Sequence, residues 1–165
     1  MENQKKFYEL HLQRFSTLYL LFGYIELELR HRVVATLSNY AKGKSYSEWF
    51  HIVPKEKQFS LAIRRALSKN RGSQKEFERF LPFSFWKDLF HKKYFLYLWV
   101  PALHKVFLGL ANPKNLESLK FISKKLELAH QIRNRLAHYN FQDSGNFEAE
   151  KALLESIVSA LEAPS

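Results

Sequence analysis

The sequence predicts an all-α protein, folded as a single bundle with two unusually long helices. Only 5 glycines and 5 prolines interrupt its 165 residues, which leaves long stretches free to stay helical. No segment keeps the sustained alternation of apolar and polar residues that a half-buried strand requires. Hydrophobic residues make up 46% of the chain and include 15 phenylalanines, which indicates a packed core rather than disorder. We therefore expect residues 1–165 to form one domain.

The first long helix is expected to run from Lys5 to Tyr40. It ends at the sequence AKGKS, where Gly43 suits the cap region that follows a helix. The apolar residues of this segment recur at the spacing of one helical face, at Phe15, Leu18, Phe22, Ile25, Leu29 and Val33.

The sequence of the middle of the chain predicts shorter helices. A second helix is expected from Lys55 to Lys69. Ser73 and Glu76 then have the S-x-x-E spacing of a capping box, which predicts a short third helix. The sequence LPFSFW indicates a turn, after which Ser84 is a candidate cap for a further turn of helix.

Proline and asparagine residues divide the last third of the chain. Pro101 is expected to kink or restart the segment from Tyr94 to Leu108, because proline lacks the backbone N–H that a helix interior needs. Asn115 suits the N-cap of the second long helix, and Asn146 suits that of a last helix ending near Leu161. The sequence QDSGN before this last helix is expected to form a loop.

The charge of the chain favours a polyanionic partner. A formal net charge of +10 points to nucleic acid first and to an acidic membrane surface second. Residues 55–79 hold eight lysines and arginines against three glutamates. A solvated helix face is the alternative interpretation of this stretch. If the stretch binds RNA, its candidate contacts are Arg64, Arg65, Lys69 and Arg71.

Several classes of protein and of site are excluded. The sequence has no cysteine, which excludes disulfides and thiolate metal sites and is compatible with the reducing cytoplasm, where we expect the protein. No apolar run reaches the ~18 residues of a membrane span, so we expect no membrane association. No HExxH, Walker or GxSxG motif occurs, and no carboxylate cluster has metal-ligand spacing. We therefore expect neither a metal nor a cofactor.

An arginine interrupts the apolar face of the second long helix. At helical spacing, position 133 is the one charged position among Leu119, Ile122, Leu126, Ala129 and Leu136. Arginine is almost never fully buried without a partner. Two interpretations of Arg133 are open: a structural ion pair with a buried carboxylate, and a functional role.

His138 follows Arg133 by five residues. Projected at about 100° per residue, the two side chains point about 140° apart and cannot readily converge on one small group. A helix break near Leu136 would bring them together, and so would a second copy of the chain across a twofold axis. In the structural alternative, His138 only ends the helix, where a cation suits the helix dipole.

The first long helix also carries a charge near its core-facing side. Glu26 lies at the edge of the apolar face, and Arg30 follows at the i,i+4 spacing that favours an ion pair. Charged groups on two long helices suggest a polar seam with a function. Without a metal, a histidine that carries protons and an arginine that binds phosphate suit RNA, whose 2′-hydroxyl is a built-in nucleophile.

Three stretches of the sequence resemble one protein family. They are YIELELR, LPFSFWKDLF followed by YFLYLWVPALHKVF, and LAHQIRNRLAH. The last contains R-x4-H, the signature of HEPN-domain ribonucleases, and together the stretches resemble the Abi-like (abortive infection) branch of that superfamily over nearly the whole chain. The resemblance implies a HEPN-like bundle that dimerises through the R-x4-H helix, so that two motifs face one another in a composite cleft.

The resemblance also implies an activity and its residues. It implies metal-independent RNA cleavage in prokaryotic defence or in a toxin–antitoxin system. Arg133 would bind the scissile phosphate and His138 would carry the proton. Residues expected to orient these groups, to brace the site or to contact RNA are Asn134, Glu26, Arg30 and Arg135.

The partners that the resemblance implies are RNA, a second copy of the chain and an antitoxin. HEPN toxins that a nucleotidyltransferase silences carry a tyrosine two residues after the histidine, whereas Tyr139 follows His138 directly. A neutralising RNA or another protein is therefore expected as readily as that enzyme. The alternative function, from a different class, is a non-catalytic RNA-binding or adaptor module with the same bundle and basic surface.

Overall fold

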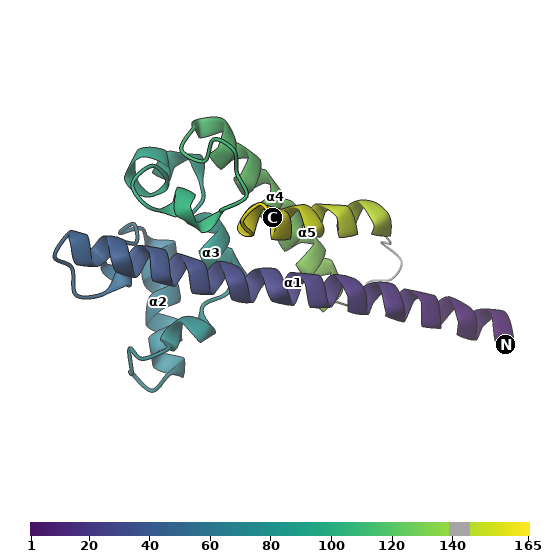
Figure 1. Ribbon diagram of the computed structural model, residues 1–165. Coiled ribbons are helices and arrows are strands. Elements are labelled where there is room, and N and C mark those ends of the chain that lie inside the picture. The colour runs from purple at the N-terminus through teal and green to yellow at the C-terminus, as the bar shows by residue number, and fades with distance from the viewer. Residues whose placement is uncertain (139–145) are drawn as a thin grey trace.

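The computed structural model describes residues 1–138 and 146–165, and in these residues the secondary structure is entirely helical (Figure 1). The α-helices are α1 (Glu2–Gly43), α2 (Lys57–Lys69), α3 (Phe83–Asp88), α4 (Leu116–Ala137) and α5 (Phe147–Leu161). Short 3₁₀ and π-helical turns lie between them: η1 (Trp49–His51), η2 (Phe77–Phe80), η3 (Lys92–Tyr94), η4 (Phe95–Trp99) and η5 (Leu103–Val106). The predicted all-α bundle with two long helices, α1 and α4, is confirmed.

Helix α1 is the longest element of the bundle. Its 42 residues give it a length of ~63 Å at 1.5 Å per residue. Its buried side chains begin at Leu18 and then follow one face to Ala41, as the apolar spacing predicts. Residues 2–10 are exposed, and this N-terminal end extends beyond the rest of the molecule in Figure 1. The part of α1 that contributes buried side chains to the core therefore runs from Leu18 to Ala41.

The structure corrects the expected position of Arg133 on the apolar face of α4. The buried positions are Leu119, Ile122, Leu126, Ala129, Ile132 and Leu136. Ile132 takes the core position that the apolar spacing assigns to Arg133, and Arg133 is exposed. One helical period of 3.6 residues after Ala129 falls between positions 132 and 133, so either residue can face the core. The apolar one does, because burying isoleucine costs no charge desolvation.

Helix α5 lies alongside α1, and its C-terminal end packs closely against the loop before α4. At its start, the guanidinium of Arg14 lies 5.4 Å from the centre of the Phe147 ring. At its end, the N–H of Gly109 donates to the carbonyl of Ala160 at 3.0 Å. A β-carbon at Gly109 would lie 2.2 Å from the Ser159 carbonyl oxygen, so only glycine fits this approach.

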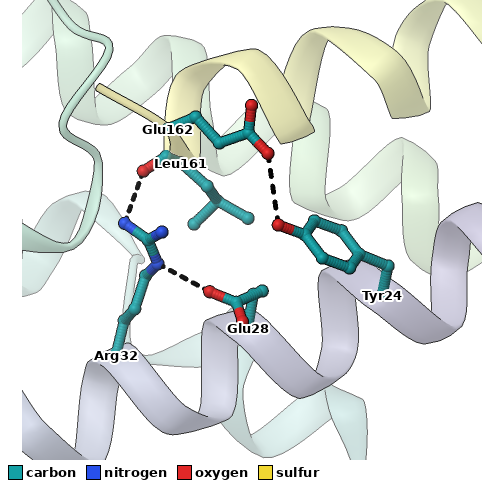
Figure 2. A network of polar contacts seen from close by, with 5 residues as sticks. All are labelled: Tyr24, Glu28, Arg32, Leu161 and Glu162. Atoms are coloured by element: carbon teal, nitrogen blue, oxygen red, sulfur yellow. Dashed lines mark hydrogen bonds and ion pairs between the residues drawn. The ribbon is translucent and has the colours of Figure 1, made fainter.

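A polar network fastens the C-terminal end of α5 to the middle of α1 (Figure 2). Arg32 donates from Nε to Glu28 at 3.0 Å and from Nη1 to the carbonyl of Leu161 at 2.6 Å. Tyr24 donates its hydroxyl hydrogen to Glu162 at 3.2 Å. The last carbonyl of a helix lacks a partner within the helix, so Arg32 both satisfies it and complements the helix dipole.

Of the four predicted N-terminal helix caps, two are confirmed and two are wrong. The side chain of Asn115 accepts from Ser118 N at 2.8 Å, and that of Asn146 accepts from Ala149 N at 3.2 Å, as predicted. Ser84 caps nothing, because it lies inside α3, whose N-cap is Pro82. The segment around Pro101 is broken into η4 and η5, in agreement with the prediction.

The capping box of Ser73 and Glu76 does not form. Glu76 has a φ of 55°, a left-handed conformation, and only the 3₁₀ turn η2 follows it. The side chain of Asn70 donates to the carbonyls of Ser73 and Lys75, each at 2.8 Å. These bonds set the backbone of the loop in place of a helical turn.

Candidate functional site

Helix α4 ends beside the middle of α1, and a cleft of about 320 Å³ lies between them. Phe22 of α1 and Leu136 of α4 are both buried, and both line the cleft. Gly23 follows Phe22 in the lining, and a β-carbon built there would meet no atom within 4 Å. The lining residues are Phe15, Tyr19, Phe22, Gly23, Glu26, Arg133, Leu136 and Ala137.

Two opposite charges share this cleft without pairing. Glu26 enters it from α1 as a half-buried side chain, and Arg133 enters it from α4 as an exposed one. Within the described part of the chain, neither side chain forms a hydrogen bond or an ion pair. A carboxylate accepts hydrogen bonds only, and a guanidinium donates only. The cleft therefore offers an acceptor and an anion-binding donor at the same time.

Aromatic rings form the other end of the cleft. Phe15 and Tyr19 stack with ring centres 5.8 Å apart and planes 12° from parallel. Tyr19 is 61% exposed, so its ring keeps a large accessible surface. An exposed aromatic ring is a surface on which a nucleobase stacks.

His138 lies outside the cleft. It is exposed, it directly follows the last residue of α4, and its N–H donates to the carbonyl of Arg135 at 3.2 Å. Because α4 stays helical to Ala137, it has no break near Leu136 that would bring the two side chains together. The side chains of Arg133 and His138 therefore leave α4 in different directions, as the helical projection indicates. Asn134, next to Arg133, is exposed as well.

The ion pair expected between Glu26 and Arg30 does not form among the described residues. Arg30 instead lines a second cleft of about 500 Å³, on the side of α1 that faces η2. Two residues further on, Glu28 and Arg32 have the same i,i+4 spacing and do pair. Glu26 and Arg30 therefore line different clefts, and a joint role of the two residues stays a prediction.

The predicted RNA contacts fall into two structural settings. Arg135 forms two hydrogen bonds with Glu150 of α5, one of them 2.5 Å long, so its guanidinium ties α4 to α5. Contact of Arg135 with RNA stays a prediction. The other four residues are exposed on α2 or directly after it: Arg64, Arg65, Lys69 and Arg71.

One histidine near the cleft escaped the sequence analysis. His130 lies one turn before Arg133, half-buried, with its ring centre 5.9 Å from that of Phe83. Burial lowers the pKa of His130, and the nearby charges of Lys87 and Arg133 lower it further. The sequence feature that could have indicated His130 is its i,i+3 spacing to Arg133. This spacing places the two side chains about 60° apart around the helix.

Comparison of the chain with known protein families, with characterised proteins and with solved structures finds no match. Of the helices that the structure describes, none has the length and apolar character needed to cross a membrane. Among the same residues, no group of three or more histidine, aspartate or glutamate side chains is placed to hold a metal ion. The charged side chains given in the cleft lining are Glu26 and Arg133.

Proposed function

We propose that this protein is a metal-independent endoribonuclease that acts as a toxin or abortive-infection effector in prokaryotic defence. The observation that carries the proposal is the guanidinium of Arg133, which is exposed at a cleft without a carboxylate partner among the described residues. A fold that used Arg133 for stability would pair it, as this fold pairs Arg32 and Arg135. An unpaired arginine at a cleft is suited to bind a phosphate.

The reaction would use the 2′-hydroxyl of the RNA as its nucleophile. His138 would remove the 2′ proton or supply the proton for the leaving group. The 2′-oxygen forms a bond to phosphorus, the bond from phosphorus to the 5′-oxygen breaks, and that oxygen receives a proton. The products are a 2′,3′-cyclic phosphate and a 5′-hydroxyl. Arg133 would stabilise the charge that develops on the phosphoryl oxygens.

A homodimer would complete the site. Since Arg133 and His138 diverge by about 140° on one helix, a second copy related by a twofold axis has to supply the opposite group. Large apolar side chains outside the cleft lining stay exposed along α1: Leu20 at 71% and Leu27 at 60%. Exposed apolar surface of this kind is typical of a protein–protein interface.

The test is cleavage of total RNA by the purified protein in excess EDTA, with the new ends mapped chemically. We expect cleavage that leaves cyclic phosphates, and its loss in Arg133→Ala and in His138→Ala. Lys42→Ala and His31→Ala are the matched controls, because they remove a positive charge and an imidazole at exposed positions outside the cleft. Activity that EDTA abolishes and magnesium restores would contradict the proposal, and so would full activity of His138→Ala.

A non-catalytic RNA-binding or adaptor module is the second candidate. The exposed basic residues of α2 favour it, because they can bind phosphates without any chemistry. RNA that binds to wild type and to both variants without ever being cleaved would establish this function instead.

A further inference from the structure

Binding of a phosphate to Arg133 would leave the volume of the cleft and its other lining side chains unused. The cleft volume of about 320 Å³ falls at the lower end of the ~300–1,000 Å³ typical of small-molecule sites. The aromatic pair of Phe15 and Tyr19 lies in the same cleft as the carboxylate of Glu26. A flat ligand that stacks on aromatic rings and presents hydrogen-bond donors at its edge would satisfy both.

Glu26 selects among such ligands by the hydrogen bonds that it can accept. A carboxylate has two acceptor oxygens and no donor, and both oxygens together suit two adjacent donors. The Watson–Crick edge of guanine presents two adjacent donors, N1–H and the 2-amino group. The corresponding edges of adenine and cytosine alternate a donor with a ring-nitrogen acceptor, and uracil presents one donor between two carbonyls. The lone pairs of those acceptors would face the carboxylate.

We propose that this cleft binds a guanine base of single-stranded RNA, next to the phosphate that Arg133 holds. Placement of that phosphate rests on the proposed ribonuclease function, whereas recognition of the base rests on the cleft alone. Unpaired bases of RNA are commonly read by stacking on aromatic rings and by hydrogen bonds to their Watson–Crick edges. The cleft holds both elements, with a guanidinium in the same cavity for the attached phosphate.

Gly23 provides the space for the base. It lines the cleft, and no atom lies within 4 Å of the position that a β-carbon would take. The β-carbon of a larger side chain would therefore meet no neighbour, and its further atoms would take up space in the cleft. Gly23→Val therefore removes the binding space, while Glu26→Gln keeps the shape and replaces one acceptor oxygen by a donor.

The experiment measures binding, so that it does not depend on cleavage. Short RNA oligomers that differ in a single central base carry 2′-deoxy sugars at that residue and at the residue before it, which removes the nucleophiles for both phosphates of the central nucleotide. Affinity for wild type is compared by fluorescence anisotropy for oligomers with guanine, inosine, adenine or uracil. Inosine lacks the 2-amino group alone. We expect guanine to bind best and inosine to bind about tenfold more weakly, within the range for removal of one half of a bidentate hydrogen bond.

The variants locate the effect in the cleft. Glu26→Gln should reduce the preference for guanine over adenine about ten- to hundredfold. Gly23→Val should weaken binding of the guanine oligomer to the level of the uracil oligomer. Ala35→Val is the matched control, since it introduces the same side chain at an exposed position of α1 outside the cleft and should change nothing. Circular dichroism melting curves show whether each variant is folded.

The outcomes separate this inference from the proposed function. Guanine-selective binding that both cleft variants abolish supports the inference, even if no RNA is ever cleaved. Equal affinity for all oligomers overturns the inference, even if the protein cleaves RNA. Free guanosine monophosphate serves as a second probe. If it binds in the cleft while the guanine oligomer does not, the site is specific for a free nucleotide and its assignment to RNA is overturned.

Discussion

Two glutamates of α1 that are only two residues apart lie in opposite environments. Glu28 pairs with Arg32 at 3.0 Å, and Arg32 also holds the final carbonyl of α5 (Figure 2). Glu26 faces the cleft and has no ion-pair partner among the described residues, although Arg133 lines the same cavity. One side of α1 therefore uses its charges to hold α5, and the other leaves its charges available.

The difference indicates where function and where stability reside. A half-buried charge without a partner weakens a fold, since its lost hydration is not replaced. The pairs on the α5 side replace that hydration with charge-assisted hydrogen bonds. Substitutions on the α5 side should therefore lower stability, whereas substitutions on the cleft side should change binding and catalysis with little effect on stability.

The largest expected effect comes from one substitution made at two arginines. Arg133→Ala should lower the rate of RNA cleavage ~10²- to 10³-fold, the usual range for loss of a charge-stabilising donor. It should leave the free energy of unfolding nearly unchanged. Arg32→Ala should lower that free energy by about 2 kcal/mol, because it leaves the carbonyl of Leu161 and the carboxylate of Glu28 unpaired. Urea denaturation and cleavage assays of both variants make the comparison. Loss of stability in Arg133→Ala without loss of activity would reverse the assignment of the two regions.

The next effect comes from one substitution made at two glycines. Gly109→Ala should destabilise the protein by about 3 kcal/mol, because the new β-carbon would lie 2.2 Å from the Ser159 carbonyl oxygen. Gly23→Ala should stabilise it by ~0.5 kcal/mol or more, since alanine is the better helix former and no atom is in the way. Thermal unfolding of both variants checks the opposite signs. A destabilising Gly23→Ala would mean that the cleft side is packed as tightly as the α5 side.

Much of the fold could be predicted because helical periodicity and side-chain caps are local. The side chains of Asn115 and Asn146 each accept from a backbone N–H three residues ahead. Ser73 and Glu76 have an equally good local pattern. There, the side chain of Asn70 binds the loop carbonyls instead, and the cap is replaced by hydrogen bonds that the capping pattern does not encode.

The site was harder to predict, because it depends on which helices meet. Counting the apolar face of α4 in steps of three and four places Arg133 in the core, although Ile132 satisfies the same steps. The pairs Glu26–Arg30 and Glu28–Arg32 have identical spacing in the sequence. Only the position of α5 decides between them, because Arg32 gains the carbonyl of Leu161 as a further partner. The pairing of residues 15–26 with residues 133–137 likewise follows from tertiary contact alone.

The third prediction separates the basic face of α2 from the cleft. Neutralising Arg64 and Arg65 together should weaken binding to any single-stranded RNA. It should also reduce the slope of log K against log salt by ~0.7 for each phosphate that the variant no longer neutralises. Neutralising Lys5 and Lys6 is the charge-matched control, as both are exposed and already near Glu9 and Glu2. An equal change in both double variants would show that only net charge matters.

The smallest effect concerns the charge that Arg133 exerts on His130. Burial is the main cause of the lowered pKa of His130, followed by the positive charge of Lys87, with Arg133 a lesser contribution. Arg133→Gln should therefore raise the pKa of His130, and by less than Lys87→Gln does. Titration of the imidazole by NMR measures both shifts. Arg32→Gln is the control, since that guanidinium is neutralised by Glu28 and lies on the other side of α1.

The lowered pKa of His130 also makes stability depend on pH, with a defined sign. As the pH falls below ~6.5, the ordinary value for histidine, the unfolded chain takes up a proton before the folded chain does. The stability that neutral His130 contributes is present above that pH and is lost as the pH falls toward its folded-state pKa. Urea unfolding of wild type should therefore show a decrease between about pH 7.5 and pH 5.5 that is smaller in His130→Gln. Equal decreases in both proteins would mean that His130 is as well solvated in the folded state as in the unfolded chain.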